Sequence, residues 1–248
     1  MSKRKERVFL GVPTYDGTIV AGLLPAVINA SQDGCTMYRT RGHSLLAHNF
    51  NVLYTEALNG RRKPHEYTHF VLLHSDIIPE MGWLGKMLDI MAETKAGVLA
   101  AVSPMKSVKG LTSTGVDQGT EDDPFLVQRL TMTEIHRLPE TFTDPKLVVN
   151  SGLLLVDIRQ PWADQVFFEI QSRIARLKNG DLQARVHSED WYFSRQVRAL
   201  GGSIYATRAV RLLHVGRHEY SNAFVWGTEE TDPNFKSPEN PAAHKKEG

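Results

Sequence analysis

Polar side chains follow several apolar runs of this sequence, at the points where buried strands are expected to end. The polar segments are residues 13–16, 74–76, 103–106 and 214–216. Open, mainly parallel sheets bind ligands at the carboxyl ends of their strands, so four such segments together predict a binding site at one edge of a sheet. Any single polar strand end is also explained by contact with solvent.

Asp76 carries the sharpest local signal, because it comes just after the apolar run 69–73. A carboxylate at the end of a buried strand can hold a divalent cation that also binds two phosphate oxygens. The same residue, followed by Ile-Ile-Pro, also fits a turn acid without a ligand. His214 is a second candidate metal ligand, since neutral imidazole suits ions such as Mn²⁺. A lone histidine more often has a structural role.

Two adjacent acids, Glu189 and Asp190, open a helical pattern for which Ser188 is the expected N-cap. Acids in a first turn are stabilised by the helix dipole by ~0.3–1 kcal/mol each, which explains both without catalysis. The functional alternative is that one of them is a general base that deprotonates an acceptor hydroxyl. The aromatic residues 191–193 would then supply apolar walls for a sugar or a base.

Asn49 lies on the apolar stripe of another helical pattern, four positions from Leu45 and from Leu53. A buried amide needs hydrogen-bond partners. The sequence therefore leaves two roles open for Asn49, a tie between two strands or a contact with a ligand.

The elements that would position these residues alternate between strands and helices. Continuous apolar runs, typical of strands covered on both faces, occur at residues 8–12, 69–73, 98–102 and 153–156. Helical patterns occur at residues 18–30, 44–58, 83–95 and 188–200. This alternation predicts an α/β fold with a mainly parallel sheet flanked by helices. Residues 107–123 are expected to form a long loop, and 125–137 a hairpin or an edge insertion.

The composition is that of a globular protein with no strong overall charge. The 248 residues include 41% apolar residues, and the formal net charge is +1. No apolar run approaches the ~20 residues of a membrane span. There is no signal-peptide pattern, and the single cysteine, Cys35, cannot form an internal disulfide. We expect a cytoplasmic protein with one domain over residues 1–227 and a polar, disordered tail over 228–248.

The order of the motifs resembles the GT-A-fold glycosyltransferases of the broad family 2 type. The matching pieces span Val8 to Gly216 and are GVPTYDG, RGHSLLAHN, FVLLHSDIIP, AAVSPMK, VNSGLLLVDI, SEDWYFSRQVRALGG and LLHVG. The sequence departs from the family pattern at His74, which replaces the first acid of the Asp-x-Asp triplet. The Gln-x-x-Arg-Trp element of processive synthases is absent, so the resemblance implies an enzyme that makes single transfers.

The resemblance implies a GT-A, Rossmann-like fold and a sugar transfer that depends on Mn²⁺ or Mg²⁺. The donor would be a nucleotide sugar, most simply a UDP-sugar, and the acceptor a hydroxyl group attacked with inversion. Metal binding falls to Asp76 and His214, and the catalytic base to Glu189 or Asp190, of which Asp190 matches the usual base. The implied nucleotide-binding residues are Pro13, Thr14, Tyr15, Asp16, Asn49, His74, Ser75 and Lys106.

The sequence gives arguments against two alternative functions. A nucleotidyltransferase would carry a Gly-x-Gly-x-Arg loop after its first strand, and none is present. A non-catalytic nucleotide-sugar-binding protein would not need Asp76, Asp190 and His214 together. The acceptor stays open, with a saccharide or small molecule ahead of a hydroxymethylated DNA base. The DNA alternative depends on a basic patch formed by Arg39, Arg41, Arg61, Arg62 and Lys63.

Overall fold

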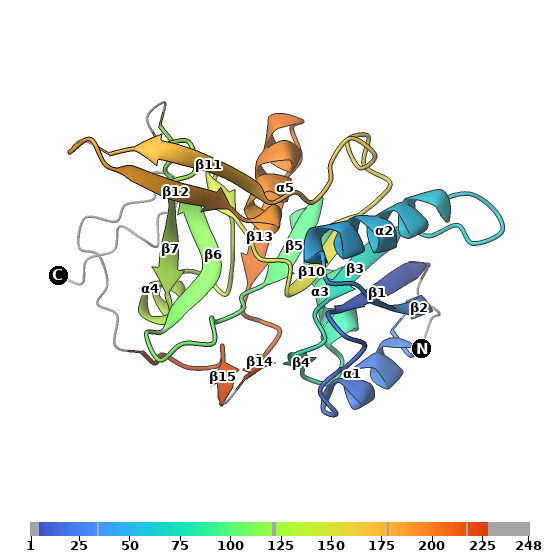
Figure 1. Ribbon diagram of the computed structural model, residues 1–248. Coiled ribbons are helices and arrows are strands. Elements are labelled where there is room, and N and C mark those ends of the chain that lie inside the picture. The colour runs from blue at the N-terminus through green and yellow to red at the C-terminus, as the bar shows by residue number, and fades with distance from the viewer. Residues whose placement is uncertain (1–4, 34, 121–122, 178, 217, 228–248) are drawn as a thin grey trace.

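A seven-stranded sheet forms the centre of the protein in the computed structural model, which describes residues 5–33, 35–120, 123–177, 179–216 and 218–227 (Figure 1). Its strand order is β2-β1-β3-β10-β5-β13-β8. These strands are β1 (Val8–Thr14), β2 (Cys35–Gly42), β3 (His69–Leu73), β5 (Val98–Ala101), β8 (Thr141–Phe142), β10 (Leu153–Asp157) and β13 (Ile204–Thr207). The tail expected over 228–248 lies outside the described residues.

The sheet is mostly parallel. Strand β1 pairs in parallel with β2 and β3, and β13 pairs in parallel with β5. Strand β10 lies between β3 and β5 and is antiparallel to both, and β8 is antiparallel to β13 at the edge. This mixed α/β architecture is compatible with the GT-A-like fold that the sequence predicts.

Helices cover both faces of the sheet, which explains the continuous apolar runs. Alternate residues of β1 enter two separate cores. Phe9 packs with α2 (Leu46–Asn59) and α5 (Glu189–Ala199) in one core. Leu10 packs on the other face with α1 (Leu23–Ala30) and α3 (Trp83–Thr94). The helix expected over 18–30 begins later than predicted, at Leu23. No helix in the described part of the chain has the length and apolar character needed to cross a membrane.

The long loop expected over 107–123 was a wrong prediction. It contains β6 (Leu111–Asp117), the middle strand of a three-stranded sheet with β7 (Val127–Thr131) and β9 (Leu147–Val148). Buried threonine hydroxyls replace apolar packing in β6, as Thr112 Oγ1 donates to the Leu130 carbonyl at 2.8 Å. Residues 125–137 form β7 and the short helix α4 (Met132–Arg137).

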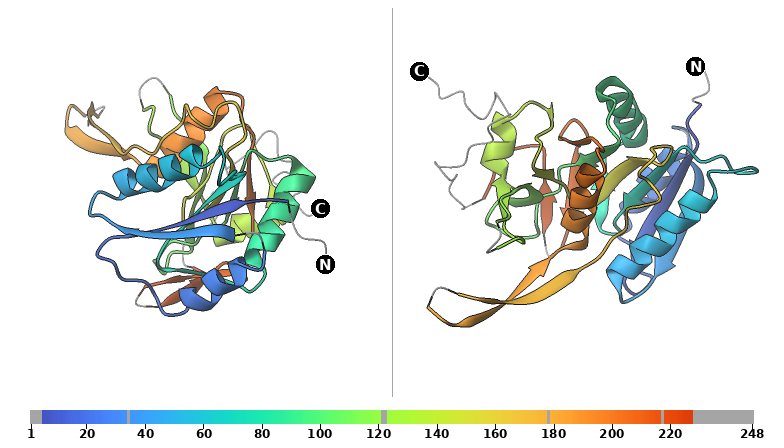
Figure 2. Two further views of the ribbon diagram at one scale, coloured as in Figure 1. Left: turned by 90° about the vertical axis from the view of Figure 1, so that its right-hand side faces the viewer. Right: turned by 90° about the horizontal axis from the view of Figure 1, so that it is seen from above.

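Two further sheets extend from the ends of the central sheet. One joins β4 (Ile77–Pro79), β14 (Leu212–Val215) and β15 (Glu219–Ser221) in the order β15-β14-β4. The other is a hairpin of β11 (Gln171–Arg176) and β12 (Leu182–His187), which the sequence analysis did not predict. Figure 2 shows this hairpin projecting from the body of the protein. Its second strand leads directly into α5.

Candidate functional site

The carboxylate of Asp76 lies in the turn between β3 and β4. The amide of Ile77 donates to the His74 carbonyl at 3.1 Å and closes this turn. Strand β4 pairs with β14, which sets His214 opposite Ile77, and the Val215 amide donates to the Asp76 carbonyl at 2.8 Å. The pairing of these two short strands therefore brings Asp76 and His214 together from positions far apart in the sequence.

His214 presents its Nε2 atom to Asp76, at 3.7 Å from Oδ2. Its other ring nitrogen, Nδ1, lies 2.7 Å from the Pro104 carbonyl. A carbonyl oxygen only accepts, so Nδ1 carries a proton, and the neutral ring then has its lone pair on Nε2. Lys106 forms an ion pair with the same Asp76 oxygen. Three predicted site residues thus meet at one point.

Asp76 is held in its ionised form. Burial favours the neutral acid, but the adjacent His214 ring and the Lys106 ammonium group outweigh it and hold the pKa of Asp76 well below its usual range. Its Oδ1 atom is buried and has no hydrogen-bond partner within the described residues.

This donor set fits a divalent cation. A carboxylate oxygen without a partner and an imidazole lone pair, oriented by a hydrogen bond on the far side of the ring, match the ligands and outer-shell support that Mn²⁺ sites use. Within the described ranges, no three His, Cys, Asp or Glu side chains cluster as a complete metal site. A metal held by Asp76 and His214 would therefore need further oxygen donors from a bound ligand or from water.

The end of β1 lies beside this point. The Val20 amide donates to the Ser75 carbonyl at 2.9 Å, which ties the segment after β1 to the turn that carries Asp76. Pro13 and Thr14 are buried, whereas Tyr15 is 71% exposed. Asp16, also exposed, accepts hydrogen bonds from the hydroxyl and the amide of Thr18, which lower its pKa. The side chains of Tyr15, Asp16 and Thr18 thus face solvent.

Asn49 is fully buried and serves as a tie between strands. Its Nδ2 atom donates to the Arg41 carbonyl at 2.8 Å and to the Thr14 carbonyl at 3.2 Å. These carbonyls belong to neighbouring strands, so the amide fixes the ends of β1 and β2. The structure favours this role over the nucleotide contact that the family resemblance implies, because the side chain has no exposed surface.

His74 is half-buried at the end of β3. Its Nε2 atom lies 3.3 Å from Ser151 Oγ, and its ring contacts Phe50 with a centroid separation of 5.1 Å. Burial lowers the pKa of His74 to about 4, so the ring is neutral at pH 7. Where the family carries an acid, this chain therefore has a neutral group that hydrogen-bonds to a serine.

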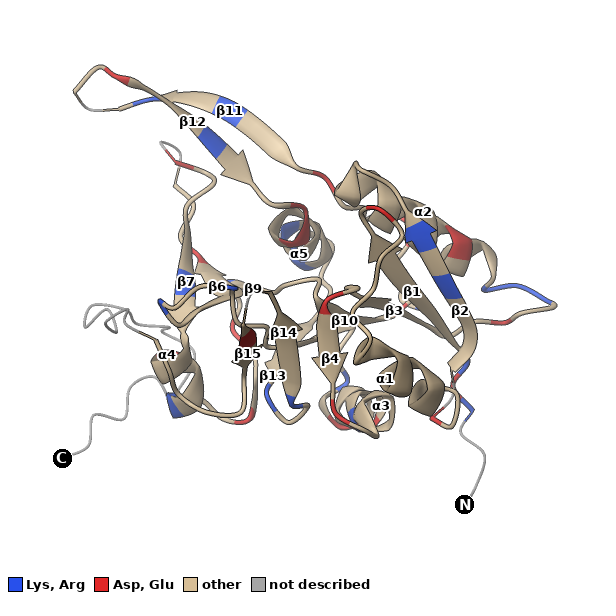
Figure 3. Ribbon diagram, turned by 60° about the horizontal axis from the view of Figure 1, so that its bottom comes forward, with Lys and Arg blue, Asp and Glu red and all other residues tan. Residues whose placement is uncertain are grey.

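Glu189 and Asp190 occupy the first turn of α5. The Ser188 hydroxyl donates to Asp190 Oδ1, as does the Trp191 amide at 2.8 Å, so Asp190 has a fixed orientation. Ser188 is the N-cap residue, but its hydroxyl binds this carboxylate instead of a backbone amide. Figure 3 shows the acidic start of α5 beside the basic strands of the hairpin.

Both acids are held toward their neutral forms. Burial and the adjacent Asp190 charge raise the pKa of Glu189 to about 7. Burial also raises the pKa of Asp190, although Ser188, the Trp191 amide and the charge of Arg129 act in the opposite direction. The helix dipole alone does not account for Glu189, because its side chain is half-buried beside a second carboxylate.

A chain of hydrogen bonds connects the acids to the Asp76 side of the site. The Ser194 hydroxyl donates to the Asp190 carbonyl at 2.9 Å and accepts from the Val149 amide at 3.2 Å. The next residues, Asn150 and Ser151, bind the segment after β5 and the His74 ring respectively. The end of β3, which leads into the Asp76 turn, and the helix that carries Asp190 thus both contact one short segment, residues 149–152.

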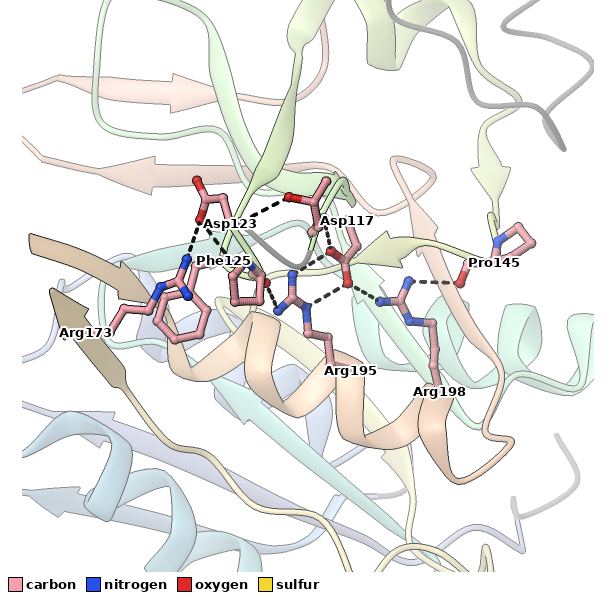
Figure 4. A network of polar contacts seen from close by, with 10 residues as sticks. Asp117, Asp123, Phe125, Pro145, Arg173, Arg195 and Arg198 are labelled. Atoms are coloured by element: carbon pink, nitrogen blue, oxygen red, sulfur yellow. Dashed lines mark hydrogen bonds and ion pairs between the residues drawn. The ribbon is translucent and has the colours of Figure 1, made fainter. Parts of the chain in front are cut away.

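Sequence analysis missed the groups that anchor α5. Asp117 at the end of β6 binds two arginines of α5, Arg195 through Nε at 2.7 Å and Arg198 at 3.2 Å (Figure 4). Arg129 of β7 lies over the Trp191 ring, 4.3 Å from its centroid. The spacing of the two arginines, three residues apart on one helix, was the available signal.

The basic patch proposed for DNA is partly compensated. Arg39 pairs with Glu56 at 2.9 Å, and Arg61 pairs with Asp164 at 3.1 Å. These two arginines are therefore neutralised locally, which weakens the electrostatic case for a DNA acceptor.

Comparisons with known proteins support the fold alone. No family model matches the chain, and no curated protein matches it. Among solved structures it is similar to A197 from STIV, with 12% identity, a TM-score of 0.55, and coverage of 91% of this chain and 95% of that one. It also matches TarS 1-349 from S. aureus, with 12% identity, a TM-score of 0.39, and coverage of 82% and 58%. The second likeness is too weak to carry an argument, so this chain shares its fold with A197.

Proposed function

We propose that the protein is a metal-dependent, non-processive glycosyltransferase that moves a sugar from a UDP-sugar to an acceptor hydroxyl with inversion. The observation that carries this proposal is the Asp76–His214 pair, which offers an unpartnered carboxylate oxygen and an oriented imidazole lone pair. Supporting it, two acids with raised pKa values begin α5, a helix that contacts residues 149–152, as does His74 next to the Asp76 turn.

Asp76 and His214 would hold Mn²⁺ or Mg²⁺, which when bound neutralises charge on the leaving diphosphate. We assign the nucleoside contacts to Tyr15 and Asp16, whose side chains face solvent. His74 and Ser75 shape the turn beneath the metal ligands.

Asp190 is the proposed general base. The hydrogen bonds from Ser188 and the Trp191 amide fix its carboxylate, and a base must be held within reach of the proton that it removes. In the reaction, Asp190 takes the acceptor hydroxyl proton while the acceptor oxygen bonds to the anomeric carbon. The bond between that carbon and the diphosphate oxygen breaks, and UDP leaves with its electron pair.

A donor panel tests this function. The protein is incubated with UDP-, GDP-, CMP- and dTDP-sugars, with Mn²⁺ or with EDTA, and nucleotide release is measured with and without a panel of saccharide acceptors. We expect release from a UDP-sugar that requires the metal and is faster with an acceptor. Equal nucleotide release in EDTA refutes the proposed dependence on a metal. If a UDP-sugar binds but no nucleotide is released under any condition, the non-catalytic alternative is supported instead.

A further inference from the structure

Lys106 places a positive charge beside the two proposed metal ligands, Asp76 and His214. Its ammonium group pairs with Asp76 Oδ2, the oxygen that also faces His214 Nε2. The Lys106 and Asp76 side chains are 35% and 31% exposed, so this pair lies at the mouth of the site and not in its core. The carboxylate proposed to bind a divalent ion through Oδ1 therefore already pairs with a cation through Oδ2.

The absence of a side chain at Gly216 leaves room for the Lys106 side chain. A Cβ atom at Gly216 would lie 3.0 Å from Lys106 Cδ, so a larger residue there would press on the lysine stem. The same segment supplies the Pro104 carbonyl that orients His214. Residues 104–106 thus contact both proposed metal ligands, one through a carbonyl and the other through an ammonium group.

We propose that Lys106 is the resident counter-cation of Asp76, which weakens binding of a divalent ion alone and transfers to the donor diphosphate when metal and nucleotide bind together. This inference rests on the proposed function. Like charges repel at such separations, so an ammonium on Oδ2 opposes a divalent ion on the same carboxylate. A diphosphate brings negative charge to the metal, and a flexible lysine is suited to move onto a phosphate oxygen.

Mn²⁺ titrations by calorimetry test the proposal without any measurement of transfer. Wild-type protein, K106M and K109M are each titrated with Mn²⁺ alone and with Mn²⁺ in the presence of UDP. Lys109 is an exposed lysine three residues away and serves as the matched control. We expect K106M to bind Mn²⁺ alone about tenfold more tightly than wild type, as removal of one like charge at a half-exposed site predicts. K109M should match wild type.

UDP should strengthen Mn²⁺ binding strongly in wild type and less in K106M, because the lysine no longer contributes to the diphosphate site. K106Q, with circular dichroism as the check on folding, should repeat the K106M result. If K106M binds Mn²⁺ no more tightly than wild type, the Lys106 proposal is overturned. The proposed metal site at Asp76 and His214 is not contradicted by that result. If no variant binds Mn²⁺ with or without UDP, the metal of the proposed function is refuted and this proposal falls with it.

Discussion

Replacement of Glu189 by glutamine is expected to stabilise the protein at pH 8 far more than at pH 5. Burial and the adjacent Asp190 charge raise the pKa of Glu189 from 4.5 to about 7. Between pH 4.5 and about 7, the Glu189 carboxyl therefore keeps its proton in the folded state and loses it in the unfolded state. As a result, the folded state loses stability as pH rises from about 4.5 to about 7, and the cost stays constant at higher pH.

The size of the effect follows from the two pKa values. The difference between 4.5 and about 7 corresponds to about 3 kcal/mol, at about 1.4 kcal/mol per pH unit. Solvent screening of a half-buried side chain and the interaction with Asp190 reduce this to about 2 kcal/mol. Glutamine imitates the neutral acid at every pH. We therefore expect the free energy of unfolding of E189Q to exceed that of wild type by about 2 kcal/mol at pH 8 and by less than about 1 kcal/mol at pH 5.

Urea unfolding of both proteins at a series of pH values measures this difference. Burial lowers the pKa values of three histidines, His69, His74 and His187, to about 4, which gives wild type an opposite pH dependence. That contribution is common to both proteins and cancels in the difference. E93Q, at an exposed acid of α3, is the control and should show a difference near zero at all pH values. A difference between E189Q and wild type that does not change with pH refutes the assignment of a raised Glu189 pKa.

Two further substitutions test other parts of the site. D190N should lower the single-turnover transfer rate by ~10²–10⁴ at saturating donor, with UDP affinity retained, because the base is lost while the Asp76 side of the site is intact. If D190N transfers at the wild-type rate and E189Q is inactive, the two roles are reversed. N49A should lower the free energy of unfolding in urea by about 2 kcal/mol, since the Thr14 and Arg41 carbonyls lose the buried amide that joins them. The control N59A, at an exposed position at the end of the same helix, should change it by less than about 0.5 kcal/mol, and an equal loss in both would contradict the strand tie.

The buried strands of the central sheet were the readily predictable part of the fold. The apolar run 69–73 has the same bounds as β3, and the runs at 98–102 and 153–156 differ from β5 and β10 by one residue. Their side chains are covered on both faces, so hydrophobicity alone marks them. Strand direction leaves no such mark, and the antiparallel orientation of β10 could not be predicted from its composition.

The elements that were missed are held by other interactions. Strand β6 is rich in threonine and serine. The buried Thr112 hydroxyl binds backbone carbonyls and the buried Thr114 hydroxyl binds the Asn150 side chain, so neither fills an apolar core. The hairpin of β11 and β12 did carry a signal. Asn179-Gly180 lies between its strands, and Gly180 adopts a φ of +91°, which favours glycine. Apolar periodicity could not detect the hairpin, but turn chemistry could have.

The candidate site was predictable as a set of strand ends but not as a geometry. The spacing of Asn49 from Leu53 correctly indicated burial, although Leu45 on its other side is exposed. Burial in turn decided between the two possible roles of Asn49. The contact between Asp76 and His214 depends on β4, a strand of three residues with no pattern of its own. The half-buried state of Glu189 depends on packing across α5, which adjacent sequence does not encode.

The antiparallel direction of β10 is what unites the two halves of the site. A parallel strand between β3 and β5 would carry its first residues to the opposite edge of the sheet. Because β10 runs the other way, residues 149–152, which precede it, lie at the edge where β3 and β5 end. There the Gly152 carbonyl accepts from the His74 amide at 2.9 Å, and a Cβ atom on Gly152 would lie 3.0 Å from Ser103 Oγ. Val149, three residues earlier, meets Ser194 of α5. A single reversed strand thus links the ligands proposed for the metal to the acid proposed as the base.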